Sequence, residues 1–198
     1  MDPAASLRIG CLVMAAGNAS RFGANKLAAE LDGRTLIERA LDAVPKGMFA
    51  AVCVASQYEG IEELAGKYGF APIHNAHPDW GLSYTIRLGT QAMRACDGIL
   101  YLVADQPLLR RDSVQRIAEA WLRTPEKIAG ASHEGRRGNP NLFPARFFTE
   151  LLALEGDCGG NLVIKRHTED YLPVELAPEE LRDCDTPQEL AALRIQAE

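Results

Sequence analysis

Short, continuous apolar runs alternate with amphipathic stretches along most of the chain. The runs IGCLVMA, FAAVCVAS and GILYLVA have the length and even apolarity of strands buried on both faces. Between them, residues 35–44 carry apolar side chains at helical spacing, and Thr35 with Glu38 three residues later matches a capping box. Strands that alternate with helices at this spacing predict an α/β fold with βαβ units and a mainly parallel sheet.

The same pattern predicts the other elements. The expected strands are residues 9–15, 49–56, 71–75, 98–104, 127–132 and 171–176, with 98–104 the most central. The expected helices are residues 35–44, 60–69, 82–95, 111–124, 145–156 and 186–197, the last with Thr186 as its N-cap and Pro187 as its first residue. Residues 135–144, rich in Gly and Pro, are expected to form a loop.

Nothing in the sequence divides the chain, so we expect one domain over residues 1–198. Within it, residues 8–125 are expected to bind a nucleotide, residues 126–182 to form an acceptor-facing lobe, and residues 183–198 to form a metal-binding loop and a helix.

Composition narrows the classes of partner. The 198 residues are 47% apolar and 24% charged, as in a globular protein long enough to bury a core. A net charge of −6 without a basic face argues against a nucleic-acid partner. No apolar run approaches the roughly 20 residues of a membrane span, and the first residues lack a signal-peptide pattern. We therefore expect a cytoplasmic protein with no membrane partner, in which five dispersed cysteines are reduced.

The loop after the first expected strand, MAAGNASRFGANK, indicates a phosphate ligand. Gly17 and Gly23 let the backbone approach a partner closely, and Arg21 and Lys26 add positive charge. Asp105 follows another buried strand, and parallel sheets bind ligands at the carboxyl ends of their strands. A carboxylate there is suited to hold Mg²⁺ on a nucleoside triphosphate.

The loop fits neither the dinucleotide fingerprint nor the P-loop. It resembles the signature (L/M)-A-A-G-x-S-x-R-(F/M)-G-x-x-K of the MobA-like nucleotidyltransferase family. The matching residues are Met14, Ala15, Ala16, Gly17, Arg21, Phe22, Gly23 and Lys26, with Ser20 displaced by one position. The resemblance continues through PDWGLSYTIRLG, VADQP, GNPNLFP, GDCGGN and RDCDTPQEL, in one order over most of the chain. The subgroup that it resembles most is molybdenum cofactor cytidylyltransferase, whose fold is a Rossmann-like, three-layer αβα sandwich.

This resemblance implies transfer of CMP from CTP to a molybdopterin-type cofactor, with release of pyrophosphate and with a molybdoenzyme as receiving partner. The implied cofactor is Mg²⁺, with Mn²⁺ as the alternative. The implied catalytic residues are Arg21, Lys26 and Asp105. The implied metal ligands are Asp105 and Asp185, with Asp183 as the alternative to Asp185. The implied nucleotide-binding residues are Ala15, Ala16, Gly17, Asn18, Ser20, Gly23, Lys26, Gly81 and Thr85. The implied acceptor-binding residues are Gly138, Asn139, Pro140, Gly156 and Asp157.

Several alternatives stay open at this point. Gly160 and Asn161 replace the Ala-Arg pair of the family pattern, so the acceptor could instead be a methylerythritol or sugar phosphate. Within the family that the chain resembles, the Ala15–Gly17 turn implies CTP rather than GTP. A protein that delivers nucleotide or molybdenum cofactor without turnover is the alternative outside enzymes. Asp105 could also be only a turn residue, and Thr85 an ordinary helix residue.

Overall fold

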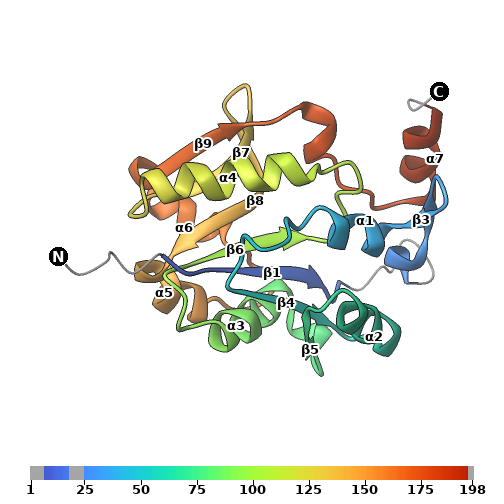
Figure 1. Ribbon diagram of the computed structural model, residues 1–198, viewed down its shortest axis with the longest axis horizontal. Helices are drawn as coiled ribbons and strands as arrows, with labels where there is room; N and C mark the ends of the chain where they lie inside the picture. The colour runs from blue at the N-terminus through green and yellow to red at the C-terminus, as the bar shows by residue number, and fades with distance from the viewer. Residues whose placement is uncertain (1–6, 18–24, 196–198) are drawn as a thin grey trace.

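The computed structural model describes residues 7–17 and 25–195, and seven strands of that part of the chain form one sheet (Figure 1). Their order across the sheet is β5-β4-β1-β6-β8-β7-β9. Their bounds are β1 Ile9–Ala15, β4 Ala51–Ser56, β5 Ala71–His74, β6 Gly98–Val103, β7 Ile128–His133, β8 Arg136–Pro144 and β9 Tyr171–Glu175. Strand β8 runs antiparallel to β6 and β7, and every other pairing in this sheet is parallel. Two short strands, β2 Glu30–Leu31 and β3 Arg34–Thr35, form a separate hairpin.

Helices cover both faces of the seven-stranded sheet (Figure 1). The apolar faces of α1, α2, α4 and α7 pack in one core cluster, and those of α3, α5 and α6 pack in the other. Their bounds are α1 Leu36–Asp42, α2 Glu59–Lys67, α3 Leu82–Ala92, α4 Arg111–Arg123, α5 Phe148–Leu152, α6 Asn161–Arg166 and α7 Pro187–Ile195. Within the described ranges, none of these helices has both the length and the apolarity that a membrane crossing needs.

Neighbouring residues of the central strands serve opposite core clusters. In β1, Cys11 and Val13 pack with α1 and α4, whereas Leu12 packs with α3. In β6, Leu100 belongs to the same core cluster as Cys11 and Val13, and Tyr101 to the same cluster as Leu12. Successive residues of both strands therefore face a core, on one side of the sheet or the other. This explains the continuous apolar runs from which the sequence predicts strands covered on both faces. The three-layer αβα architecture is confirmed.

One prediction is wrong: residues 135–144 do not form a loop, because β8 spans Arg136–Pro144. The turn lies just before it, where Glu134 and Gly135 have positive φ values of 47° and 77° and begin a hairpin with β7. Glycine and proline inside the segment suggest a loop, but strand pairing on both sides overrides that local preference. Helix α6 is also not among the predicted elements, since its six residues are too few for a clear helical period.

The sheet order places the ends of β1 and β6 together. Strand β1 lies between β4 and β6, since the chain adds β4 and β5 on one side of β1 and then crosses to the other side at β6. Ligands bind at such a switch point in open α/β sheets, outside the carboxyl ends of the strands. Met14 is paired with Val103, and the N–H of Ala104 donates to the carbonyl oxygen of Met14 at 3.2 Å. The segments that follow the two strands therefore leave the sheet side by side.

Candidate active site

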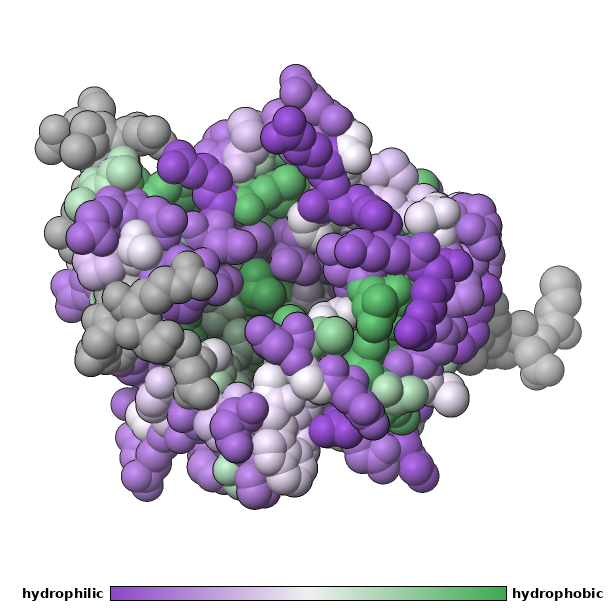
Figure 2. Space-filling view, turned by 180° about the vertical axis from the view of Figure 1, so that it is seen from behind, coloured by the Kyte–Doolittle hydropathy of each residue, from purple (hydrophilic) through white to green (hydrophobic). Residues whose placement is uncertain are grey.

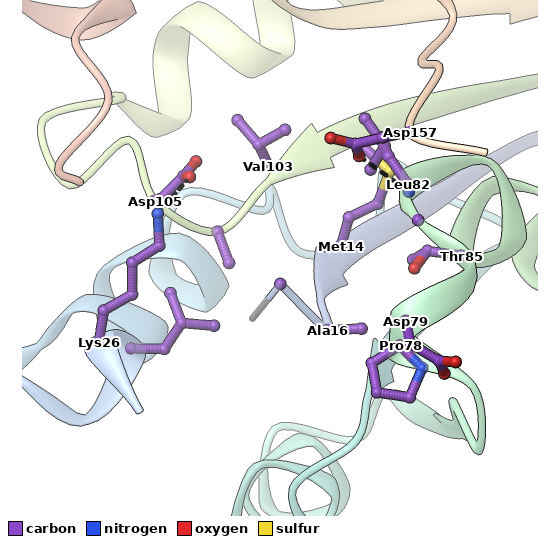
Figure 3. A pocket seen from close by; sticks show the side chains of 14 residues that line it. Met14, Ala16, Lys26, Pro78, Asp79, Leu82, Thr85, Val103, Asp105 and Asp157 are labelled. Carbon is purple, nitrogen blue, oxygen red and sulfur yellow. Dashed lines mark hydrogen bonds and ion pairs between the residues drawn. The ribbon is translucent and has the colours of Figure 1, made fainter. Parts of the chain in front are cut away.

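A cavity of about 510 Å³ lies at the carboxyl ends of β1 and β6. Figure 3 shows Lys26 and Asp105 on one side of this cavity and Pro78, Asp79 and Thr85 on the other. The lining residues are Met14, Ala16, Gly17, Lys26, Leu27, Pro78, Asp79, Gly81, Leu82, Thr85, Val103, Ala104, Asp105 and Asp157. The face turned to the viewer in Figure 2 is hollowed near its middle, and apolar residues form the floor of the hollow.

Lys26 joins two carboxylates at one end of the cavity. Its Nζ donates to Asp105 Oδ2 and to Asp185 Oδ1, each at 2.8 Å. Residues 26, 105 and 185 are far apart in sequence, so the fold itself assembles this group. The Lys26 side chain is 12% exposed and that of Asp105 is 25% exposed, which strengthens the attraction relative to a pair in open solvent. The site is thus built around one cation held by two carboxylates.

Local structure fixes each member of this group. Lys26 begins a 3₁₀ helix, Lys26–Ala28, in which Asn25 Oδ1 accepts from the N–H of Leu27 at 3.1 Å. Asp105 follows β6, and its carbonyl oxygen accepts from the N–H of Cys184 at 2.8 Å. This bond ties the loop before α7 to the end of β6, and it brings Asp185 within reach of Lys26.

The same loop is closed by a capping box at α7. Glu189 Oε2 accepts from the N–H groups of Asp185 and Thr186 at 2.7 and 2.9 Å, and the N–H of Glu189 donates to Thr186 Oγ1 at 3.2 Å. The predicted helix start at Thr186 and Pro187 is confirmed. Asp185 therefore sits on a fixed turn rather than at the end of an unsupported segment.

The charges at this end of the cavity are strongly coupled. Partial burial lowers the pKa of Lys26, but the negative charges and hydrogen bonds of Asp105 and Asp185 outweigh it and hold that pKa above its usual value. Asp183 lies nearby and accepts from Gln106 Nε2 at 3.0 Å. Partial burial and the charge of Asp105 raise the pKa of Asp183. The site therefore favours a positive charge at the place that Lys26 now holds.

The opposite wall is the start of α3, which is capped by a distant segment. Gly81 has φ 83° and ψ −178°, a conformation that is nearly restricted to glycine. A Cβ there would lie 2.5 Å from the carbonyl oxygen of Gly156, so glycine also permits the close approach of that loop. The N–H groups of Leu82 and Ser83 donate to Asp157 Oδ1 and Gly156 O, each at 3.3 Å. Asp157 thus supplies the cap that α3 lacks in its own sequence.

The structure brings most of the described site residues together. Those that line the cavity are Ala16, Gly17, Lys26, Gly81, Thr85, Asp105 and Asp157, and Asp185 joins them through Lys26. Ala15, the last residue of β1, is buried at 1% exposure and is not among the lining residues. Gly138, Asn139 and Pro140 lie on β8 and, with Gly156, are not among the lining residues. Their role toward an acceptor stays a prediction. Asn18, Ser20, Arg21 and Gly23 lie outside the described residues.

Several lining residues are missed by the sequence reasoning. Asp79 and Leu82 lie close to Gly81, within the motif PDWGLSYTIRLG. Their position in that motif is a sequence signal from which they could have been predicted as site residues. Leu27 and Val103 line the cavity as apolar residues, for which the sequence offers no signal beyond adjacency to Lys26 and Asp105.

Comparison with known proteins identifies the family. The model of the MobA-like NTP transferase domain matches residues 11–171. The chain belongs to this family. A relative, purine catabolism protein PucB of Bacillus subtilis (strain 168), is 27% identical over an alignment of 194 positions, and the alignment covers 91% of this chain and 93% of PucB. The predicted resemblance is confirmed at the level of a MobA-like nucleotidyltransferase.

Solved structures share the fold of this MobA-like protein. A nucleotidyl transferase from Methanothermobacter (Mth528) superposes with a TM-score of 0.77 at 22% identity, over 96% of this chain and 97% of that one. Rv0371C from Mycobacterium tuberculosis H37Rv, solved as a complex with manganese, gives a TM-score of 0.76 at 19% identity, over 95% of this chain and 98% of its own. At these identities the similarity establishes the Rossmann-like nucleotidyltransferase fold.

Proposed function

We propose that this MobA-like protein transfers CMP from CTP to a molybdopterin-type phosphate and releases pyrophosphate, with a divalent metal ion as cofactor. The observation that carries the proposal is the contact of Lys26 with both Asp105 and Asp185 at one end of a 510 Å³ cavity. Groups suited to phosphate and to a cation gather there, and the remaining walls are mostly apolar with a few polar groups, as in sites for a base.

The residues at this end fit a divalent metal ion. Carboxylate oxygens of Asp105 and Asp185 converge on one cation, the Lys26 ammonium. Hard oxygen ligands suit Mg²⁺ and Mn²⁺, which proteins commonly hold through one or two carboxylates and the substrate's phosphates. The manganese complex of Rv0371C supports a divalent ion in this fold. Asp105 and Asp185 would hold the ion, which when bound neutralises charge on the triphosphate.

In the proposed reaction, an oxygen of the acceptor's phosphate attacks the α-phosphorus of CTP. A bond forms between that oxygen and phosphorus, and the bond from phosphorus to the bridging oxygen of the β-phosphate breaks, so pyrophosphate leaves. The protein contributes mainly position and charge. Lys26, at the edge of the cavity, is placed to bind a phosphate oxygen once it leaves its two carboxylates. Arg21 is proposed from the sequence as a second cation.

The choice of substrates rests on different walls of the cavity. Ala16 and Gly17 follow β1 directly and line the cavity, and their turn resembles that of CTP-using relatives. Asp157 lines the cavity from the segment expected to bind the acceptor. We propose that Gly138, Asn139 and Pro140 extend this acceptor side along β8.

A pyrophosphate-release assay tests the proposal. CTP, GTP, UTP and ATP are each supplied with Mg²⁺ or Mn²⁺, with and without molybdopterin. We expect pyrophosphate only when CTP, molybdopterin and a metal ion are all present. Release with a methylerythritol or sugar phosphate in place of molybdopterin would assign a different acceptor. Tight CTP binding without any release would instead identify a nucleotide-binding delivery protein.

A further inference from the structure

Thr85 contributes a hydroxyl group to the wall opposite Lys26 and Asp105 (Figure 3). It lies one turn into α3, and only 3% of it is exposed. A buried hydroxyl on a cavity wall can present either its hydrogen or its lone pairs to a ligand. Which of the two it presents depends on what its other side contacts.

That other side is held by Asn75, which is 1% exposed and follows β5 directly. The backbone N–H of His77 donates to Asn75 Oδ1 at 3.0 Å. Because a backbone N–H can only donate, the amide oxygen of Asn75 must face His77. The amide nitrogen therefore faces Thr85, where Nδ2 donates to Oγ1 at 3.0 Å. The N–H of Asn75 also donates to the carbonyl oxygen of Ser56 at 2.7 Å, which fixes the residue against β4.

This arrangement makes Thr85 an acceptor toward Asn75, so its O–H must point elsewhere. Thr90 on the same helix shows the usual alternative, in which the hydroxyl donates to the carbonyl oxygen of Ile86 one turn earlier, at 2.6 Å. In the part of the chain that the structure describes, Thr85 makes no such bond, and the equivalent carbonyl of Gly81 accepts from the N–H of Tyr84. The Thr85 hydrogen is left for the cavity.

We propose that Asn75 is a positioning residue that fixes the Thr85 hydroxyl as a hydrogen-bond donor to the base of the nucleotide. A fixed donor selects a base that offers an acceptor at that place. N3 of cytosine is such an acceptor, whereas N3 of uracil carries a hydrogen and would meet the Thr85 hydrogen head-on. This inference rests on the proposed function, and it adds the residue that sets the polarity of base recognition.

Burial explains why polarity matters here. A hydroxyl free to rotate adapts to either pyrimidine, but two donors facing each other in a buried wall leave both unsatisfied. A site built around one hydrogen bond rejects a ligand that cannot complete it more strongly than an apolar pocket rejects a misfit. The effect of one neutral hydrogen bond corresponds to roughly 2- to 10-fold in affinity.

Dissociation constants for CTP and UTP, measured by calorimetry with Mn²⁺, test the proposal. Asn75→Ser keeps an oxygen for the N–H of His77 but is too short to reach Thr85. We expect its CTP-to-UTP preference to fall by roughly 2- to 10-fold, mainly because UTP binds more tightly to a hydroxyl that can now turn. Thr85→Val should lower the same preference because CTP binds more weakly. Thr85→Ser, which retains the hydroxyl, should keep the wild-type preference.

Thr90→Val is the matched control, since it removes a buried hydroxyl from the same helix away from the cavity. It should lower the melting temperature and leave the CTP-to-UTP preference unchanged. A folded Asn75→Ser with the wild-type preference overturns the inference. If that variant does not fold, equal preferences in Thr85→Val and Thr85→Ser overturn it. If the Asn75 and Thr85 variants bind CTP with an unchanged CTP-to-UTP preference, only this inference is overturned. If the wild-type protein does not bind CTP, the proposed function is overturned as well.

Discussion

The ammonium of Lys26 lies 2.8 Å from Asp105 Oδ2, in contact with a carboxylate that the sequence assigns to a metal ion. The same ammonium contacts Asp185, the second proposed ligand, at 2.8 Å. Lys26 therefore contacts both carboxylates and offsets one of their two negative charges. A metal ion and this ammonium compete for the same oxygens, and phosphate oxygens are the partners that Lys26 gains when it leaves them.

Lys26→Met should make the nucleotide-free protein bind Mn²⁺ more tightly. The substitution removes the competing charge while Asp105 and Asp185 remain, so we expect a gain of about tenfold or more in affinity. Turnover should fall nonetheless, because a charge-assisted contact to phosphate is worth about 1.5–3 kcal/mol. Electron paramagnetic resonance of free Mn²⁺ measures the first effect, and pyrophosphate release measures the second.

Lys46→Met is the control for this prediction, because Lys46 is exposed and is not among the residues that line the cavity. It removes the same charge from the chain and should leave Mn²⁺ affinity and turnover unchanged. Equal Mn²⁺ affinities for Lys26→Met and the wild type would show that Lys26 does not compete with the metal ion.

Asp105→Asn should reduce turnover by about 10²–10³, by analogy with the loss of one electrostatic element in other active sites. The substitution keeps the shape and one acceptor oxygen but removes the charge that would hold the metal ion. The variant should stay folded, since the backbone bond from Cys184 to the carbonyl oxygen of Asp105 is unaffected. Metal-dependent pyrophosphate release and thermal melting together measure the two effects.

Asp79→Asn is the matched control, because Asp79 lines the same cavity from the side opposite Lys26 (Figure 3). It removes one carboxylate charge and should change turnover by less than about fivefold, as surface charges seldom contribute more than about 1 kcal/mol. Turnover of Asp105→Asn within the same range would mean that Asp105 is a turn residue and not a metal ligand.

Much of the fold is predictable from local pattern. Strand β1 and the capping box of Thr35 and Glu38 are confirmed because continuous apolarity and cap chemistry act within a few residues. Strand β8 is missed because its structure depends on pairing with β6 and β7. Its partner β6 lies more than thirty residues earlier in the sequence. Neither glycine nor proline composition carries that information.

In the candidate site too, some residues are predictable from local motifs, whereas the contacts between distant residues are not. Lys26, Asp105 and Thr85 are found from motif position, and all three line one cavity. The contact of Lys26 with both carboxylates depends on three loops brought together by the sheet, so no spacing in the sequence predicts it. Asn75 is missed for the same reason, since its role comes from a contact with Thr85 ten residues later.

Gly81→Ala should destabilise the protein by about 1–3 kcal/mol, the cost of a non-glycine residue in this backbone region. Its Cβ would also press on the carbonyl oxygen of Gly156, and that displacement should weaken nucleotide binding. Gly66→Ala is the control, because no atom lies within 4 Å of a Cβ there and Gly66 is inside α2. It should stabilise the protein by about 0.5–1 kcal/mol. Chemical denaturation measures both changes in unfolding free energy. If the two substitutions change it equally and in the same direction, the backbone conformation of Gly81 does not require glycine.

Thr35→Ala should destabilise the protein by about 1 kcal/mol near neutral pH, because it removes the N-cap of α1. The start of α1 is also tied to the segment that carries Lys26, since the N–H of Leu36 donates to the carbonyl oxygen of Ala29, just after Lys26–Ala28. Glu38 Oε2 accepts from the N–H and the hydroxyl of Thr35, both at 2.8 Å.

Those hydrogen bonds give the Thr35 prediction a pH dependence. They lower the pKa of Glu38 in the folded state, so the stabilisation is present above the unfolded-state pKa of about 4.3 and is lost as the pH falls through the folded-state pKa. The difference in unfolding free energy between wild type and Thr35→Ala should therefore be larger at pH 7 than at pH 4. Urea denaturation at the two pH values measures it, with Thr149→Ala, at an exposed site, as the control. A difference that grows as the pH falls would show that Glu38 is not held as a carboxylate by Thr35.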